Sequence, residues 1–118
     1  KNKEKSFFGL PGNPISSAAC FKFFVYPYLR LILNMKREKP FKAKLKNRYE
    51  KKNNFTKFLK GKISINNKGV LEIKVLKGQE SFRIKSFTKA NVWGFFRSGK
   101  SAFKKGELIE CFNPLGVQ

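Results

Sequence analysis

The first third of the sequence changes from a short apolar run to a helical repeat of apolar positions. Phe7 and Phe8 form the run, which stops at the turn-forming segment Gly9–Pro14. From Ala19 to Leu33, apolar residues then recur at the spacing of one helix face. The pattern predicts a strand, a tight loop and a helix, in that order.

Residues with known end preferences mark the limits of this helix. Asn13 is a good N-cap, and Pro14 suits the first helical position because no backbone N–H is needed there. Pro27 lies inside the apolar pattern, so we expect it to kink the helix or to split it in two. We expect the helix to end between Asn34 and Arg37, where basic side chains suit the negative end of its dipole.

From Lys39 onward the apolar period changes from helical to alternating, so we place a domain boundary between residues 1–38 and 39–118. Turn residues separate the alternating segments, and Asn66–Gly69 has the composition of a hairpin turn. Short strands at this spacing favour a small antiparallel barrel or sandwich. The predicted strands are Phe41–Leu45, Phe58–Ile65, Leu71–Val75, Gln79–Phe87, Val92–Phe96 and Leu108–Phe112, with a single helical turn at Ala90 and Asn91.

Composition limits the size and the partners of the protein. A chain of 118 residues has room for one domain, or for a small domain joined to a piece of another. The net charge of +20 would attract polyanions. However, only five of the 27 basic residues are Arg, and the lysines are scattered over every predicted element. We therefore attribute the charge to compositional drift, and we do not expect nucleic acid as a partner.

The remaining composition excludes several kinds of chemistry. The chain has no His and all seven acidic residues are Glu, so a Ser-His-Asp or Cys-His arrangement within it is impossible. Cys20 and Cys111 lie in apolar surroundings without CxxC spacing, which indicates buried thiols rather than a zinc site. The most apolar stretch, Ala18–Leu33, is interrupted by charged residues and proline. We expect no membrane partner and a cytoplasmic location.

The segment Gly9–Pro14, with Ser16 and Ser17 after it, is the one part of the chain that suggests a ligand. A helix start exposes unpaired N–H groups and a positive dipole end, which together attract anions. The glycines would permit close approach of the backbone, and the two hydroxyls could donate to a phosphate or oxyanion. The alternative is a rigid strand-to-helix turn that binds nothing, since the segment matches neither the Walker pattern nor GxGxxG.

Several segments resemble one known family. FGLPGNPIS at Phe8–Ser16 strongly resembles the signature at the end of the molybdopterin-binding domain in the family of MoeA and the gephyrin E domain. The following FKFFVYPYLRLIL is similar to that family's helix, and KNNFTKFLKGKI to the strand before its small barrel. ESFRIKSFTKANVWGFF is similar to its Ser-Ser-Ala-Asn segment, through Ser81, Ser86, Ala90 and Asn91. The resemblance covers nearly the whole chain in the family's order.

The resemblance implies a fold class: an α/β fragment, which is the last strand, loop and helix of a MoaB-like domain over residues 1–38, followed by a small all-β antiparallel barrel over residues 39–118. It also implies a molybdopterin molybdenumtransferase, which inserts molybdate into adenylylated molybdopterin and releases AMP. That enzyme uses a divalent ion such as Mg²⁺ and works as a homodimer. The fragment alone is expected to be inactive, because the first two domains and the metal-binding carboxylates would lie outside it. The residues that would line the pterin and molybdate pocket are Pro11, Gly12, Asn13, Pro14 and Ser16.

Two other functions compete with this interpretation. A small basic barrel could bind nucleic acid by presenting Phe87, Trp93, Phe95 and Phe96 as stacking platforms, although these aromatic residues are also needed to fill a barrel core. A non-catalytic scaffold is the second alternative, because gephyrin, a relative, binds a receptor peptide.

Overall fold

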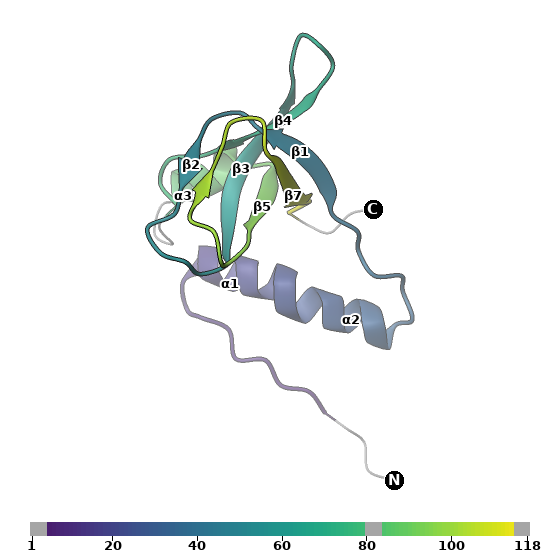
Figure 1. Cartoon of the computed structure of the whole chain (residues 1–118). Coiled ribbons are helices and arrows are strands. Elements are labelled where there is room, and N and C mark those ends of the chain that lie inside the picture. Colours follow the sequence, from purple (N-terminus) through teal and green to yellow (C-terminus); the bar gives the residue numbers. More distant parts are fainter. Residues whose placement is uncertain (1–4, 80–83, 115–118) are drawn as a thin grey trace.

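The computed structural model describes residues 5–79 and 84–114, which form a long helix lying against a small closed barrel (Figure 1). The helix comprises α1 (Pro14–Cys20), the π-helical turn η1 (Phe21–Val25) and α2 (Tyr26–Ile32). The barrel strands are β1 (Phe41–Leu45), β3 (Lys57–Ile65), β4 (Leu71–Val75), β5 (Val92–Phe96) and β7 (Leu108–Phe112). Two short strands, β2 (Tyr49–Glu50) and β6 (Ala102–Phe103), pair beside it, and α3 (Ile84–Lys89) precedes β5.

The barrel closes in the order β1-β4-β3-β5-β7, and β7 returns to β1. The small barrel is thus confirmed. Four of its five pairings are antiparallel, whereas β1 and β4 run parallel, with Lys44 beside Glu72 and Leu45 beside Ile73. Alternation along a strand cannot show which strand lies beside it, so the sequence could not predict this parallel pair.

Alternation does fix which side chains enter the core. The inward positions of all five strands meet in one apolar cluster, closed at one end by Phe103. The cluster consists of Ala43, Leu45, Leu59, Ile73, Val92, Phe96, Phe103, Ile109 and Cys111. Burial in this cluster raises the pKa of the Cys111 thiol to about 12, as expected of an inert buried cysteine, while Cys20 is only half-buried.

The predicted hairpin between β3 and β4 is present. Oδ1 of Asn66 accepts from the N–H groups of Lys68 at 2.9 Å and Val70 at 3.0 Å, so one side chain organises the turn. Gly69 has φ of +76°, a conformation that favours glycine.

The helix accommodates Pro27 by widening. Since Pro27 has no N–H, the regular bonding pattern cannot continue through it, and the N–H of Tyr26 donates to the Phe21 carbonyl, five residues back. The expected break therefore takes the form of a π-helical turn. At the other end, Asn34 has φ of +54°, while Asn34 and Met35 donate to the carbonyls of Leu31 and Arg30. This Schellman arrangement ends the helix at Ile32, two residues before the predicted range of Asn34 to Arg37.

Two predicted strands are wrong. No residue that the structure describes pairs with residues 5–8, and a strand without a partner has no ladder to stabilise it; Phe7 is exposed and Phe8 contacts the edge of the Tyr28 ring. The predicted strand Gln79–Phe87 is helical from Ile84 to Lys89, so the alternation there was misleading. Residues 80–83 of that prediction lie outside the described residues, as does Ser81 of the family-like segment.

Close packing inside the barrel generates a stability prediction. A Cβ added to Gly61 would lie 2.9 Å from Cδ1 and Cγ1 of Ile73, which is fully buried. We expect Gly61→Ala to lower the free energy of unfolding by about 1–3 kcal/mol through overpacking. Urea denaturation would measure it. Gly9→Ala, where nothing lies within 4 Å, is the matched control and should be nearly neutral; equal effects of the two changes would contradict the packing argument.

Candidate functional site

The candidate loop is held by the start of α1. Asn13 is the N-cap, Pro14 occupies the first turn, and Ile15 is buried directly after them. Pro11, Gly12 and Pro14 are exposed, whereas Asn13 and Ser16 are half-buried. The five predicted site residues, Pro11, Gly12, Asn13, Pro14 and Ser16, therefore lie together on an accessible turn of the helix.

The structure changes which donors this loop can offer. Oδ1 of Asn13 accepts from the N–H groups of Ile15 at 3.0 Å and Ser16 at 3.3 Å, and the Asn13 carbonyl accepts from Ser17 at 2.8 Å. These N–H groups are thus already bonded, contrary to the expectation that the helix start exposes unpaired ones. Within the described part of the chain, the backbone N–H groups of Gly12 and Asn13 and the hydroxyls of Ser16 and Ser17 have no partner.

The remaining donors are all neutral, and they lie at the positive end of a helix dipole. That set suits an oxyanion better than a cation, because each group can donate a proton and the helix dipole favours negative charge there. The Asn13 side chain acts as a structural cap and is not a free ligand. Its place in the site is to hold the backbone that carries the other donors.

An aromatic contact fixes the helix on the barrel. The ring of Phe23 stacks on Phe58 with centroids 3.7 Å apart, and it meets Phe112 and Trp93 edge-on at 5.3 and 6.0 Å. Phe58, Trp93 and Phe112 point outward from β3, β5 and β7, so the helix covers one side of the barrel's outer surface (Figure 1).

A cavity of about 650 Å³ lies between the helix and the barrel. Its apolar wall includes Phe23, Leu31, Phe58, Phe95 and Phe112, and none of the loop residues 11–16 contributes to it. The candidate loop and this cavity are therefore separate features. Sequence reasoning identified the loop but not the cavity, which forms only when the helix docks.

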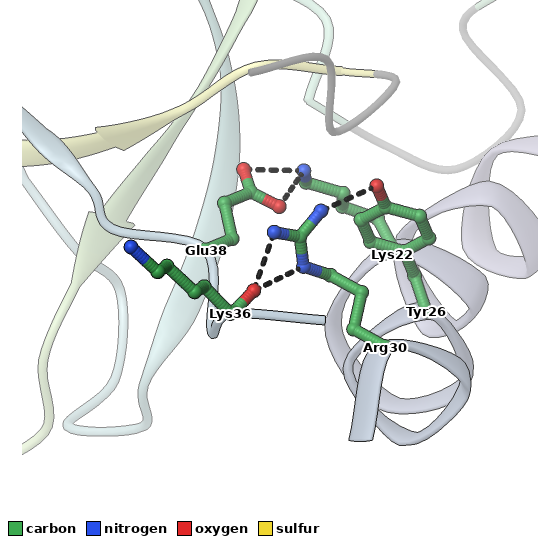
Figure 2. A network of polar contacts seen from close by, with 5 residues as sticks. All are labelled: Lys22, Tyr26, Arg30, Lys36 and Glu38. Carbon is green, nitrogen blue, oxygen red and sulfur yellow. Dashed lines mark hydrogen bonds and ion pairs between the residues drawn. The ribbon is translucent and has the colours of Figure 1, made fainter. Parts of the chain in front are cut away.

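A polar network ties the helix to the segment that leads into β1 (Figure 2). Nζ of Lys22 donates to both carboxylate oxygens of Glu38 at 2.6 Å, and Lys22 is only 4% exposed. The Arg30 guanidinium donates twice to the Lys36 carbonyl, with Nε at 2.8 Å, and to the Tyr26 hydroxyl at 3.0 Å. A buried pair with this geometry holds the chain reversal after α2 in place.

Among the residues that the structure describes, four cationic side chains are buried, although nothing in their local sequence pattern distinguishes them from the solvated lysines. They are Lys22, Arg30, Lys51 and Lys60. Lys51 donates to the carbonyls of Phe55 at 2.8 Å and Arg97 at 2.5 Å. Burial, helped by the charge of Lys57, lowers the pKa of Lys51. Each of these side chains donates to an acceptor in another segment of the chain and so holds two segments together. Their role is therefore structural.

Two of the four stacking platforms of the nucleic-acid alternative, Trp93 and Phe96, are not available, and Phe87 and Phe95 are half-buried. Trp93 is 4% exposed and Phe96 is fully buried; Phe96 lies in the barrel core, and Trp93 lies under Phe23 and Phe87. Bases cannot stack on rings that other side chains already cover.

The described residues provide neither a metal site nor a membrane span. Over residues 5–79 and 84–114, no cluster of three or more His, Cys, Asp or Glu side chains could hold a metal ion. None of the helices described is long and apolar enough to cross a bilayer.

One family model matches the chain. Residues 42–112 match the model of the MoeA C-terminal region (domain IV). A search of curated proteins gives no match.

Two solved structures share the fold. The molybdopterin biosynthesis MoeA protein of Pyrococcus horikoshii OT3 is 23% identical with a TM-score of 0.68, over 85% of this chain and 25% of that chain. A molybdenum cofactor biosynthesis protein of Pyrococcus furiosus is 19% identical with a TM-score of 0.68, over 85% of this chain and 35% of that one. The chain thus spans only about a quarter to a third of the length of these proteins.

The capping role of Asn13 can be tested directly. We expect Asn13→Ala to lower the free energy of unfolding by about 1 kcal/mol, because the N–H groups of Ile15 and Ser16 lose their acceptor. Denaturation followed by circular dichroism would measure it. Asn13→Ser, which keeps an acceptor, should cost less; an equal loss from both changes would contradict the capping role.

The ion pair of Lys22 and Glu38 should matter far more than exposed pairs. We expect Glu38→Gln to cost about 3–5 kcal/mol of unfolding free energy, because it leaves the buried Lys22 ammonium without a counter-charge. The double variant with Lys22→Met should lose less than Glu38→Gln alone.

Glu50→Gln is the matched control for this experiment. Its pair with Arg48 is mostly exposed, so removing it should cost less than about 1 kcal/mol. Urea denaturation of the parent and of these variants would measure the losses, and the single variant Lys22→Met would complete the cycle that gives the coupling energy. A Glu38→Gln protein as stable as the Glu50→Gln control would show that the Lys22 pair does not hold the helix.

Proposed function

Because the chain belongs to the MoeA family, matched over the C-terminal region (domain IV), we propose that it is the C-terminal part of a molybdopterin molybdenumtransferase. The complete enzyme would act in molybdenum cofactor biosynthesis, inserting molybdate into adenylylated molybdopterin with release of AMP. The observation that carries the proposal is the family match over residues 42–112, to which the two solved structures add the same fold.

The N-terminal part of the chain supports a place in a larger assembly. The helix also carries Phe24 and Ile32, which are 61% and 55% exposed and take no part in the cavity against the barrel. The segment at residues 5–8 has no strand partner among the described residues. Both features suit the last strand and helix of a MoaB-like domain whose sheet is supplied from outside residues 1–38, with residues 39–118 as a separate barrel domain.

The proposed substrate site is the loop before α1. There, the Ser16 hydroxyl would donate a hydrogen bond to the molybdate oxyanion. Because Gly12 has no side chain, the pterin substrate could approach its backbone N–H closely. Asn13 would act by capping the helix, while Pro11 and Pro14 would hold the loop's shape without competing donors. A hydroxyl donor suits molybdate because it is neutral and can rotate toward an oxygen.

The other partners follow from the proposed reaction. Mg²⁺ would have to be held by residues outside this chain, since the described residues offer no cluster of ligands for it. The complete protein would be a homodimer in the cytoplasm, and the chain by itself would be inactive because it lacks the domains that supply metal ligands and the rest of the pocket.

The proposal predicts molybdate-dependent AMP release by the complete protein supplied with adenylylated molybdopterin. We expect Ser16→Ala to raise the molybdate concentration for half-maximal release by about tenfold or more, because a hydrogen bond to a charged group contributes about 1.5–3 kcal/mol. Ser64→Ala, on the exposed face of β3, is the control and should leave it unchanged. Absence of AMP release would reject the enzyme; unchanged molybdate dependence would remove Ser16 from the site.

A further inference from the structure

The outer surface of the barrel has two halves of different character. On β3, β5 and β7 the outward positions nearest the helix are aromatic and are covered by Phe23. On β1, β4 and the distal half of β3 the outward positions are mainly lysines, all exposed. We call this second half the basic face. It comprises Lys42, Lys44, Lys46, Lys62 and Lys74, with Glu72 and Ser64 among them.

Strand register aligns three of these lysines. Lys62 of β3 lies directly opposite Lys74 of β4. The parallel pairing of β1 with β4 puts Leu45 beside Ile73, and the N–H of Lys46 then donates to the Ile73 carbonyl, so Lys46 follows on beside Lys74. Adjacent strands lie about 4.8 Å apart. Lys46, Lys62 and Lys74 therefore form one row across three strands, although they are well separated in the sequence.

The row opposes the fold rather than stabilising it. Within the described part of the chain, none of the three ammonium groups has a hydrogen bond or an ion pair, and Glu72 lies beside Lys44 instead. Like charges directly opposite each other on a sheet are destabilising. A neutral polar residue at any of these positions would stabilise the barrel at least as well as lysine does. The row of lysines therefore indicates binding of an anion from outside the chain.

The chemistry of the face indicates which anion. The outward positions of β1, β4 and distal β3 carry no aromatic side chain on which an unpaired base could stack. The exposed aliphatic side chains beside the basic face, Ile65 at the end of β3 and Leu108 opposite Lys44, are two single residues and not an apolar face that could enter a membrane. Lysine binds phosphate as a point charge, without the bidentate geometry that reads bases. We propose that the basic face binds the phosphate backbone of a nucleic-acid duplex, independently of base sequence.

This placement revises the expectation from the sequence, which found the lysines scattered and did not favour nucleic acid. It also differs from the aromatic version of that alternative, because Trp93 and Phe96 take no part. The proposal is independent of the transferase activity, since the basic face lies on the barrel, away from the loop that precedes α1 (Figure 1).

The test compares two triple variants of the complete protein that lose the same charge. The row variant carries Lys46→Gln, Lys62→Gln and Lys74→Gln. The control carries Lys39→Gln, Lys52→Gln and Lys89→Gln, which are exposed lysines outside the basic face. Binding of a fluorescently labelled DNA duplex of mixed sequence would be measured by anisotropy over a range of NaCl concentrations.

For the parent protein, the logarithm of the binding constant should fall linearly with the logarithm of salt concentration. Each phosphate contact adds about 0.9 to the magnitude of this slope. The row variant should therefore bind more weakly, with a slope about 2.7 smaller in magnitude, whereas the control should keep nearly the parent slope. Equal losses in the two variants would show that net charge alone is responsible and would overturn the proposal, as would a parent protein that binds no duplex at low salt.

Two further measurements separate duplex binding from a structural role of the lysines and from binding of a different polyanion. Thermal melting of the row variant should occur at or above the parent temperature, because repulsion has been removed; a lower melting temperature together with weaker binding would assign the lysines a structural role instead. The protein should bind phosphatidylserine vesicles more weakly than it binds the duplex. It should also bind poly-glutamate, as a separate probe, more weakly than the duplex. Tighter row-dependent binding to either would replace nucleic acid by a membrane or an acidic protein, and would reject the proposal.

Discussion

The arrangement of this protein depends on the docking of Phe23 against Phe58, Trp93 and Phe112. The three barrel residues point outward, where a small barrel exposed on all sides would carry polar residues. They become favourable only because the helix removes them from water. The same contact creates the cavity of about 650 Å³ beside it, since the rest of the helix cannot follow the curved barrel surface as closely.

Other features of the helix serve this contact. The π-helical turn at Phe21–Val25 contains Phe23. It also lets the helix continue past Pro27, which has no N–H to donate. Beyond the helix, Asn34 reverses the chain, and the buried pair of Lys22 with Glu38 fixes the returning segment against it (Figure 2). Helices in proteins gain most of their stability from tertiary packing, so these contacts stabilise the helix in this position.

The two ends of this architecture suggest separate roles. The loop before α1 offers neutral donors, held by the Asn13 cap, and agrees with the oxyanion site proposed for a MoeA-type enzyme. The barrel divides its outer surface between the aromatic half under the helix and the lysine half facing solvent. A single small domain can thereby dock on its own chain through one half and present a mainly positive surface through the other.

The sequence by itself determined the local elements and the family. Alternation predicted β1 and β4 with their observed limits, because a period of two shows which residues share a face, and apolar runs beside turn residues predicted the limits of β5 and β7. Asn13, Pro14 and Asn66 act through backbone groups a few residues away, so the helix start and the hairpin could also be predicted. The motif around Phe8–Ser16 indicated the family that the match over residues 42–112 then showed.

Only the tertiary structure decided what depends on distant residues. The parallel pairing of β1 with β4 and the burial of Lys22 and Arg30 both depend on three-dimensional placement. So does the row of Lys46, Lys62 and Lys74. A lysine has the same local pattern whether it is solvated, buried or aligned with others, because its environment is set by strand order and register rather than by its neighbours in the sequence.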